Sequence, residues 1–349
     1  MATQIVYPAL AQLHPTARTV VTQAIEDAIR PGFAAYSETT AALRGEIDAL
    51  CGTPSEATLN AARDGFAAVV AAWSRIEFYR FGPLMKENRT DRILFWPDRK
   101  GIGLRQVQAI LSEPDWDAFD PETLSGKSVA VQGLGALEFL LYGTESERLA
   151  TIEADFRCNY ALSIATLLAS TAAQMSAEWN DPDGISARMM RPDAANTDYR
   201  DTPEVLTELV GVMAHGVEAI RDQRILPFLG RDGEAGKPKS ALFWRSKLTV
   251  ASILGNFSGL RDLLVNSDIW EYAPTEQFRI GTEAIAEFER VAAEAGKVTG
   301  TTEEALADPV QKAALGEIVT ASQTLGRLTG EELPAALGLS VGFSSLDGD

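Results

Sequence analysis

Residues 131–143 read VQGLGALEFLLYG, an almost wholly apolar stretch that carries one carboxylate, Glu138. On a helix, Gly135 lies one turn before Glu138 and Tyr142 one turn after it, so the three residues share a face. Gly135 leaves a notch beside the carboxylate. A glutamate in such surroundings must reach water, find a cationic or hydrogen-bond-donating partner, or stay protonated, because an unpaired buried charge is too costly. The stretch therefore predicts a buried helix with a site on one face.

Two interpretations of Glu138 stay open on the sequence alone. In the first, the carboxylate belongs to a thin polar stripe or pairs with an arginine and only supports the structure, since structural ion pairs are common. In the second, it is a ligand or an acid–base group at a junction between domains.

The stretch also resembles the signature of imelysin-like proteins, Gly-X-His-X-X-Glu followed by a hydrophobic run that ends in an aromatic residue and a glycine. Gly133, Glu138 and the run FLLYG match, while Gly135 occupies the histidine position. Further resemblance comes from FGPL at 81–84, RILFWPD at 92–98 and LGLSVGFSSLDGD at 337–349. The resemblance implies a metal site in the family, and the absent histidine puts that site in doubt here.

The composition bounds the class of protein. A chain of 349 residues with 46% hydrophobic residues can bury a large core, and its length suggests two domains. The net charge of -18 argues against nucleic acid and anionic membranes as partners, because both attract clustered Lys and Arg. No apolar run approaches the roughly 18 residues that a membrane helix needs.

Cys51 and Cys158 are the two cysteines, and their spacing fits no metal site. Two buried thiols are expected rather than a disulfide, which an oxidising compartment would allow. No export signal opens the chain. Imelysin-like proteins are usually exported, so the resemblance implies a periplasmic or cell-surface protein whose signal has been removed.

Helical periodicity and capping residues recur along the chain, whereas no stretch alternates with a period of two. Pro31-Gly32 is expected to kink or break the first helix. The expected helices cover residues 15–50, 53–79, 104–111, 145–179, 203–229, 241–266, 274–295 and 302–329.

These features predict an all-α protein made of two packed up-and-down helical bundles. The boundary is placed at the turn-rich segment 180–202, which gives an N-terminal bundle over 1–190 and a C-terminal bundle over 191–349. A tryptophan–arginine pair in each half, Trp73 with Arg75 and Trp244 with Arg245, hints at an internal duplication.

The long aperiodic segment 81–100 is expected to lie against the site, because such loops are often functional. In it, Phe95 and Trp96 are candidate pocket walls and Asp98 a candidate ligand. Arg92 could hold an anion or pair with Glu138. A hydrophobic plug with exposed charges is the alternative.

The segment GFSSLDGD at 342–349 is the other candidate. Ser345, Asp347 and Asp349 could bind a cation or accept hydrogen bonds from Arg75 or Arg245, although a solvated acidic tail is the default expectation.

Several chemistries are excluded. With only His14 and His215 in the chain, a histidine-rich zinc centre cannot form, and no Gly-X-Ser-X-Gly elbow is present. His215 and Glu218 form a His-X-X-Glu pair, for which a surface pair is the favoured interpretation.

Three functions follow. The first is an exported, non-catalytic imelysin-like protein of iron or haem acquisition that binds a metal ion, a metal complex, or a partner from iron uptake at the domain junction. An iron or calcium ion would suit the carboxylates of Glu138, Asp98, Asp347 and Asp349. The second is the peptidase activity after which imelysin is named, which ranks lower because no metal triad, serine triad or cysteine dyad is present.

The third is a scaffold that has lost its metal site and binds an organic molecule. Its pocket would be walled by Trp73, Phe95 and Trp96. The sequence leaves the enzyme question open, leaning to a protein without catalysis.

Overall fold

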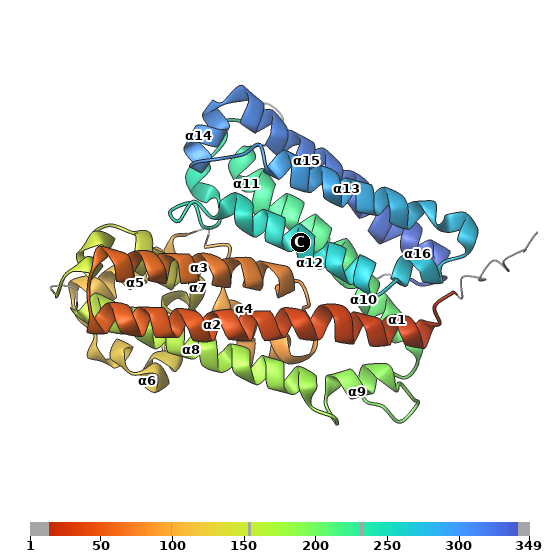
Figure 1. Ribbon diagram of the computed structural model, residues 1–349, viewed down its shortest axis with the longest axis horizontal. Coiled ribbons are helices and arrows are strands. Elements are labelled where there is room, and N and C mark those ends of the chain that lie inside the picture. The colour runs from red at the N-terminus through yellow and green to blue at the C-terminus, as the bar shows by residue number, and fades with distance from the viewer. Residues whose placement is uncertain (1–13, 99, 153–154, 231–233, 341–349) are drawn as a thin grey trace, which may run out of the picture.

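The computed structural model describes residues 14–98, 100–152, 155–230 and 234–340 (Figure 1). Every regular element in these ranges is a helix, and no β-strand is among them. The predicted all-α class is therefore confirmed.

The first half of the chain is built on three long helices, with α2 packed against both α3 and α8. Trp73 on α3 and Tyr36 on α2 meet in its core with ring centroids 5.5 Å apart. The helices of this half are α1 (Ala17–Gln23), α2 (Arg30–Gly52), α3 (Glu56–Ile76), α4 (Arg89–Ile93), α5 (Ile102–Ser112), α6 (Pro121–Ser125), α7 (Gly133–Tyr142), α8 (Asp155–Asn180) and α9 (Ile185–Met190).

The second half forms the upper group of helices in Figure 1, where α13 packs along α15, and α10 contacts both α12 and α15. Its helices are α10 (Thr202–Ala219), α11 (Leu226–Leu229), α12 (Thr249–Asn266), α13 (Arg279–Ala295), α14 (Thr302–Ala307), α15 (Pro309–Arg327) and α16 (Leu333–Ala336). The domain boundary at 190/191 stays a prediction.

Three π-helical turns, Ala24–Ile29, Ile220–Ile225 and Leu328–Glu332, interrupt the long helices. Each is followed two residues later by a proline, Pro31, Pro227 or Pro334. In each case the residue before the proline donates its N–H to the carbonyl five residues back. The wider turn accommodates a ring that has no N–H and crowds the carbonyl four residues back. Of the kink or break expected at Pro31-Gly32, the break is therefore wrong, because helical structure continues from α1 into α2 and the π turn is the distortion found there.

Two predicted helices are shorter than expected. The helix predicted from residue 145 begins as α8 at Asp155, since Glu145 has a left-handed backbone (φ 64°) and a 3-10 turn, Ser146–Ala150, follows it. The helix predicted from residue 241 begins as α12 at Thr249. Phe243 and Lys247 have positive φ angles (58° and 62°), so residues 241–248 form turns. This turn segment supplies part of the site described below.

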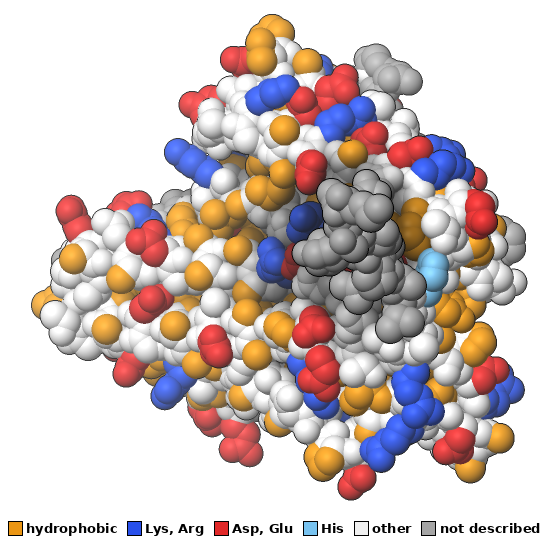
Figure 2. Space-filling model, turned by 45° about the vertical axis from the view of Figure 1, so that its right-hand side comes forward, with side chains coloured by type: hydrophobic (Ala, Val, Ile, Leu, Met, Phe, Trp, Pro, Cys, Tyr) orange, Lys and Arg blue, Asp and Glu red, His pale blue; other side chains and the backbone are white. Residues whose placement is uncertain are grey.

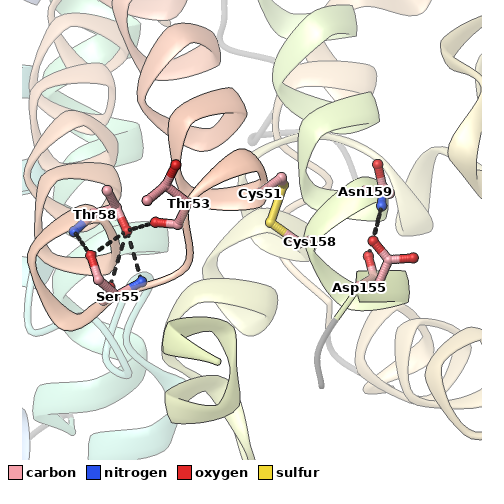
Figure 3. Close-up of a disulfide and its surroundings, with 7 residues drawn as sticks. All are labelled: Cys51, Thr53, Ser55, Thr58, Asp155, Cys158 and Asn159. Carbon is pink, nitrogen blue, oxygen red and sulfur yellow. Dashed lines mark hydrogen bonds between the residues drawn. A yellow bond between two sulfur atoms is a disulfide. The ribbon is translucent and has the colours of Figure 1, made fainter. Parts of the chain in front are cut away.

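Cys51 and Cys158 form a disulfide, so the expectation of two buried thiols is wrong (Figure 3). The C-terminal end of α2 lies beside the first turn of α8, which brings the two Cα atoms to 5.5 Å. A bond that closes a loop of 107 residues restricts the unfolded chain strongly. It therefore ties α2 to α8 covalently at one end of their shared interface.

The two halves meet most closely along α3 and α12. A Cβ atom added to Gly259 would lie 2.0 Å from the carbonyl oxygen of Arg75, and one added to Gly255 would lie 2.8 Å from the Cβ of Ser74. Ser252 adds a buried hydrogen bond of 2.9 Å to the hydroxyl of Ser74. Small residues at a spacing of three and four thus let the two helix backbones approach each other.

A buried ion pair lies at the C-terminal end of this seam. Arg224, in the second π turn, donates to Glu77 Oε2 at 2.6 Å, and Asn256 of α12 donates to Glu77 Oε1 at 2.6 Å. Asn256 also donates to the carbonyl of Ser74 at 2.7 Å. Each of the charged pair is at most 6% exposed, so loss of one partner would leave a buried charge uncompensated.

The surface reflects the acidic composition. On the face in Figure 2, Asp and Glu side chains are spread over both groups of helices, with Lys and Arg interspersed among them. Within the described ranges, no helix combines the length and the apolar character needed to cross a membrane.

The seam can be tested with two glycine substitutions. Gly259→Ala should lower the free energy of unfolding by about 1–3 kcal/mol, because the new methyl group collides with the α3 backbone. Gly316→Ala on α15 should raise it by up to about 1 kcal/mol, since no atom lies within 4 Å of the added Cβ and alanine favours helix. Urea denaturation of both variants would measure this. Equal effects would contradict the tight seam.

Candidate functional site

The helix α7 is held by its first residue. Gly133 has a φ of 71°, and a Cβ there would lie 2.4 Å from the carbonyl oxygens of both Arg92 and Ile93. Only glycine fits this close approach and this backbone conformation. The side chain of Gln132 donates to the carbonyls of Ser125 and Lys127, at 3.3 and 2.9 Å. The start of α7 is therefore fixed against residues 92–93.

Glu138, on α7, is 5% exposed and its carboxylate reaches the other half of the chain. Oε1 accepts hydrogen bonds from the backbone N–H of Ser246 at 3.0 Å and from its hydroxyl at 2.8 Å. Burial raises the pKa of the Glu138 carboxyl, while the Ser246 donors and the charge of Arg245 oppose that rise. Both Ser246 bonds go to one oxygen, and Oε2 receives neither.

Arg245 is half-buried and lies between two aromatic rings. Its guanidinium carbon is 4.5 Å from the ring centroid of Trp244 and 5.6 Å from that of Phe139. Burial lowers the pKa of Arg245, and the carboxylate of Glu138 acts in the opposite direction. Such stacking restricts the guanidinium next to the carboxylate.

A cavity of about 90 Å³ lies beside these groups. Its wall combines residues 94–96 and α7 from the first half with residues 241–245 from the second. Nothing lies within 4 Å of a Cβ added to Gly135, so this face of α7 is open. The site thus joins a buried carboxylate, a guanidinium and aromatic walls at the junction of the two halves.

Three of the candidate residues of segment 81–100 lie beside the cavity, but they do not all have the predicted role. Phe95, Trp96 and Asp98 line the cavity. Both oxygens of Asp98 are already used, because Oδ1 accepts from the N–H of Ile102 at 2.7 Å and Oδ2 from that of Gly103 at 2.8 Å. Asp98 therefore holds the first turn of α5.

Arg92 does not pair with Glu138, since its guanidinium donates to the carbonyls of Glu87 and Ser125. Tyr142 does not line the cavity either, and its hydroxyl donates to the carbonyl of Arg63 at 3.0 Å. Arg92 thus connects the segment before α4 with the end of α6, and Tyr142 connects α7 with α3.

Two further predicted residues lie elsewhere. Trp73 is 1% exposed within the core of the first half and does not line this cavity. Arg75 pairs with Asp262 of α12. Ser345, Asp347 and Asp349 lie outside the described residues, so their predicted roles stay predictions.

Sequence reasoning missed Ser246, although a signal for it is present. Residues 94–98 read LFWPD and residues 242–246 read LFWRS. Both LFW segments line the cavity, and each precedes a helix. The pairing of Trp73 with Trp244 carries no such signal, because Trp73 lies within α3 and Trp244 in a turn. The repeat around Trp96 and Trp244 is the better indication of duplication.

Metal ligands are not gathered here. In the ranges that the structure describes, no group of three or more His, Cys, Asp or Glu side chains could hold a metal ion. The described cavity wall holds two carboxylates, Glu138 and Asp98, and both accept hydrogen bonds from backbone N–H groups.

The fold and the cavity define an all-α protein with a buried carboxylate between two packed groups of helices. The chain belongs to the imelysin family: the sequence model named Peptidase_M75 and described as Imelysin matches residues 29–328. No curated protein matches the chain.

Two solved structures are similar to it. An imelysin-like protein from Psychrobacter arcticum 273-4 is 20% identical with a TM-score of 0.78, over 94% of this chain and 98% of that one. A putative iron-regulated protein A precursor from Parabacteroides distasonis ATCC 8503 is 14% identical with a TM-score of 0.71, over 92% and 98%. At these identities the likeness establishes the fold.

Glu138→Gln tests the raised pKa. A carboxyl with a higher pKa in the folded chain contributes stability fully below its unfolded pKa and loses it as the pH rises through the folded pKa. The free energy of unfolding of the wild type, relative to Glu138→Gln, should therefore fall as the pH rises above 4.5 and then level off. Urea denaturation of both proteins across this pH range measures the difference. If the free energy of unfolding of the wild type, relative to Glu138→Gln, instead rose with pH, the donors of Ser246 and the charge of Arg245 would lower the pKa of Glu138 by more than burial raises it.

Proposed function

We propose that this imelysin-family protein is a non-catalytic binding protein of iron or haem acquisition, and that its ligand enters the cavity beside Glu138. The family match and the iron-regulated protein among the similar structures support the link to iron. The observation that carries the proposal is the pairing of a buried carboxylate with a stacked guanidinium at the junction of the two halves.

The geometry favours a metal complex over a bare ion. A cation held by protein groups alone needs several oxygen or nitrogen ligands, and Glu138 supplies a single carboxylate that already accepts hydrogen bonds from Ser246. Arg245 beside it repels a bare cation and attracts an anionic group. A ligand that carries both a metal or donor group for Glu138 and an anionic group for Arg245 suits both charges.

The size of the cavity limits how much of that ligand is enclosed. At about 90 Å³ it is smaller than the roughly 300–1,000 Å³ typical of small-molecule pockets. One group of a larger molecule therefore enters between Trp96 and Trp244, with the rest over the open face at Gly135.

The peptidase alternative finds no support in the cavity. The described lining contains neither histidine nor cysteine, and no group of three or more His, Cys, Asp or Glu side chains in the described ranges could hold a catalytic metal ion.

Export is part of the proposal. The disulfide between Cys51 and Cys158 suits an oxidising compartment, where such bonds form and persist. The name of the Parabacteroides distasonis protein, a precursor, is consistent with an exported family member.

A thermal-shift screen tests the binding function. Ferric citrate, haem, ferric chloride and calcium chloride are added separately to the purified protein. Binding to the folded state stabilises it by about 2.7 kcal/mol at 100 times the dissociation constant, so ferric citrate or haem should raise the melting temperature by several degrees. Glu138→Gln should abolish the shift. Glu113→Gln, an exposed glutamate at the end of α5, is the control and should keep it.

The outcomes separate the alternatives. A shift with calcium chloride or ferric chloride alone would indicate that the site binds a bare ion and not a metal complex. No shift with any of the four, or one that persists in Glu138→Gln, would contradict the proposed site.

Gly135→His restores the histidine of the family signature. The Cβ meets no atom within 4 Å, so the imidazole fits one turn before Glu138. With a second ligand in place, Zn²⁺ should raise the melting temperature of Gly135→His and not that of the wild type. Gly135→Ala controls for the gain in helix propensity. An equal response of Gly135→His and Gly135→Ala would refute a metal position at this face.

A further inference from the structure

A second and larger cavity, of about 630 Å³, lies along α10 and shares no described lining residue with the cavity beside Glu138. One wall is a face of α10, and the opposite wall comes from Phe78 and Arg80, after α3, and from residues 338–340, after α16. Its volume falls in the range of small-molecule sites.

Three carboxylates of the cavity wall, those of Asp201, Glu204 and Glu208, lie near the N-terminal end of α10 and differ in their hydrogen-bond partners. Asp201 accepts from the N–H of Glu204 at 3.0 Å and caps α10. Glu204 accepts from the backbone N–H and the guanidinium of Arg200, at 2.7 and 2.8 Å. Glu208, half-buried one turn further on, has no hydrogen bond or ion pair with any described residue, and burial raises the pKa of its carboxyl. Among the described residues, only the charge of His215 acts favourably on this carboxylate, and no donor forms a hydrogen bond to it.

The other end of the cavity carries a cationic side chain. The guanidinium of Arg80 lies over the ring of Phe78, 5.8 Å from its centroid, and forms no hydrogen bond or ion pair with the residues that the structure describes. The nearby carboxylate of Glu77 is occupied by Arg224 and Asn256. The guanidinium of Arg80 and the carboxylate of Glu208 thus line one cavity, and neither forms a hydrogen bond or ion pair with a residue that the structure describes.

The helix between these charges leaves room for a ligand. A Cβ added to Gly211 would meet no atom closer than the ring of His215, at 3.9 Å, so there is free space beside α10 at this residue. A Cβ added to Gly216 would lie 3.4 Å from Cγ of Phe78, so Phe78, two residues before Arg80 in the chain, lies beside α10 eight residues beyond Glu208. At about 1.5 Å of rise per residue, this distance is about 12 Å along the helix.

We propose that this cavity binds a short zwitterionic peptide of about two to four residues, with its ammonium group on Glu208 and its carboxylate on Arg80. An extended peptide covers about 3.3–3.6 Å per residue, so this length matches the rise along α10 from Glu208 to the level of Phe78. A ligand with both charges gives each unpaired group a charge-assisted hydrogen bond. The lining between them is formed by α10, including Gly211 and Val212, and by Phe78, and it suits small side chains.

Isothermal titration of the full chain with trialanine tests the proposal. Two blocked forms, N-acetyl-trialanine and trialanine amide, each lack one of the charges. Trialanine should bind, and either blocked peptide should bind at least 10-fold more weakly. Failure of trialanine to bind, or equal affinity for a blocked form, would overturn the proposal.

Two variants test which side chain contacts each end of the peptide. Glu208→Gln should remove the preference for a free amino group, and Arg80→Gln the preference for a free carboxylate. Glu218→Gln, on the same helix outside the cavity wall, should keep both preferences. If a variant fails to fold, the blocked peptides on the wild type still decide. A variant that weakens both blocked and free peptides equally would contradict the assigned contact.

Discussion

The structure depends on how closely α12 lies against α3. Gly255 and Gly259 remove the side chains that would hold the two helices apart, and Asn256 between them bonds to the backbone of Ser74 and to Glu77. Arg224 completes the network as a buried ion pair. A pair of this kind adds little net stability but penalises any arrangement that separates its partners. The seam thus fixes how the two halves are placed relative to each other.

The Glu138 site follows from that placement. Ser246 lies three residues before the start of α12, so the position of α12 decides where its N–H and hydroxyl point. Gly133, at the other side of the contact, sets the start of α7 against residues 92–93. A carboxylate 5% exposed is tolerated because these two donors meet it across the junction. A shift of either half would leave the carboxylate buried without them.

The sequence predicted the helical class and singled out Glu138, because periodicity and a lone carboxylate in an apolar helix are local features. It did not predict Ser246, whose contact spans 108 residues, although the repeated LFW segments indicate it. Pro31 was misjudged because a π turn can absorb a proline that would otherwise end a helix. The disulfide was missed since proximity of α2 and α8 is a tertiary property, and Asp98 was taken for a ligand because its role at the first turn of α5 needs the fold.

Gly135 links the family signature to the chemistry of the site. Where the signature has an imidazole, this chain has open space next to Glu138. Asp98 is engaged at the first turn of α5, where its two oxygens accept hydrogen bonds from the N–H groups of Ile102 and Gly103. The described charged groups next to this space are then the carboxylate of Glu138 and the guanidinium of Arg245. On the proposed function, a metal must bring most of its own ligands, and an anionic chelator is the form of metal that this pair of charges attracts.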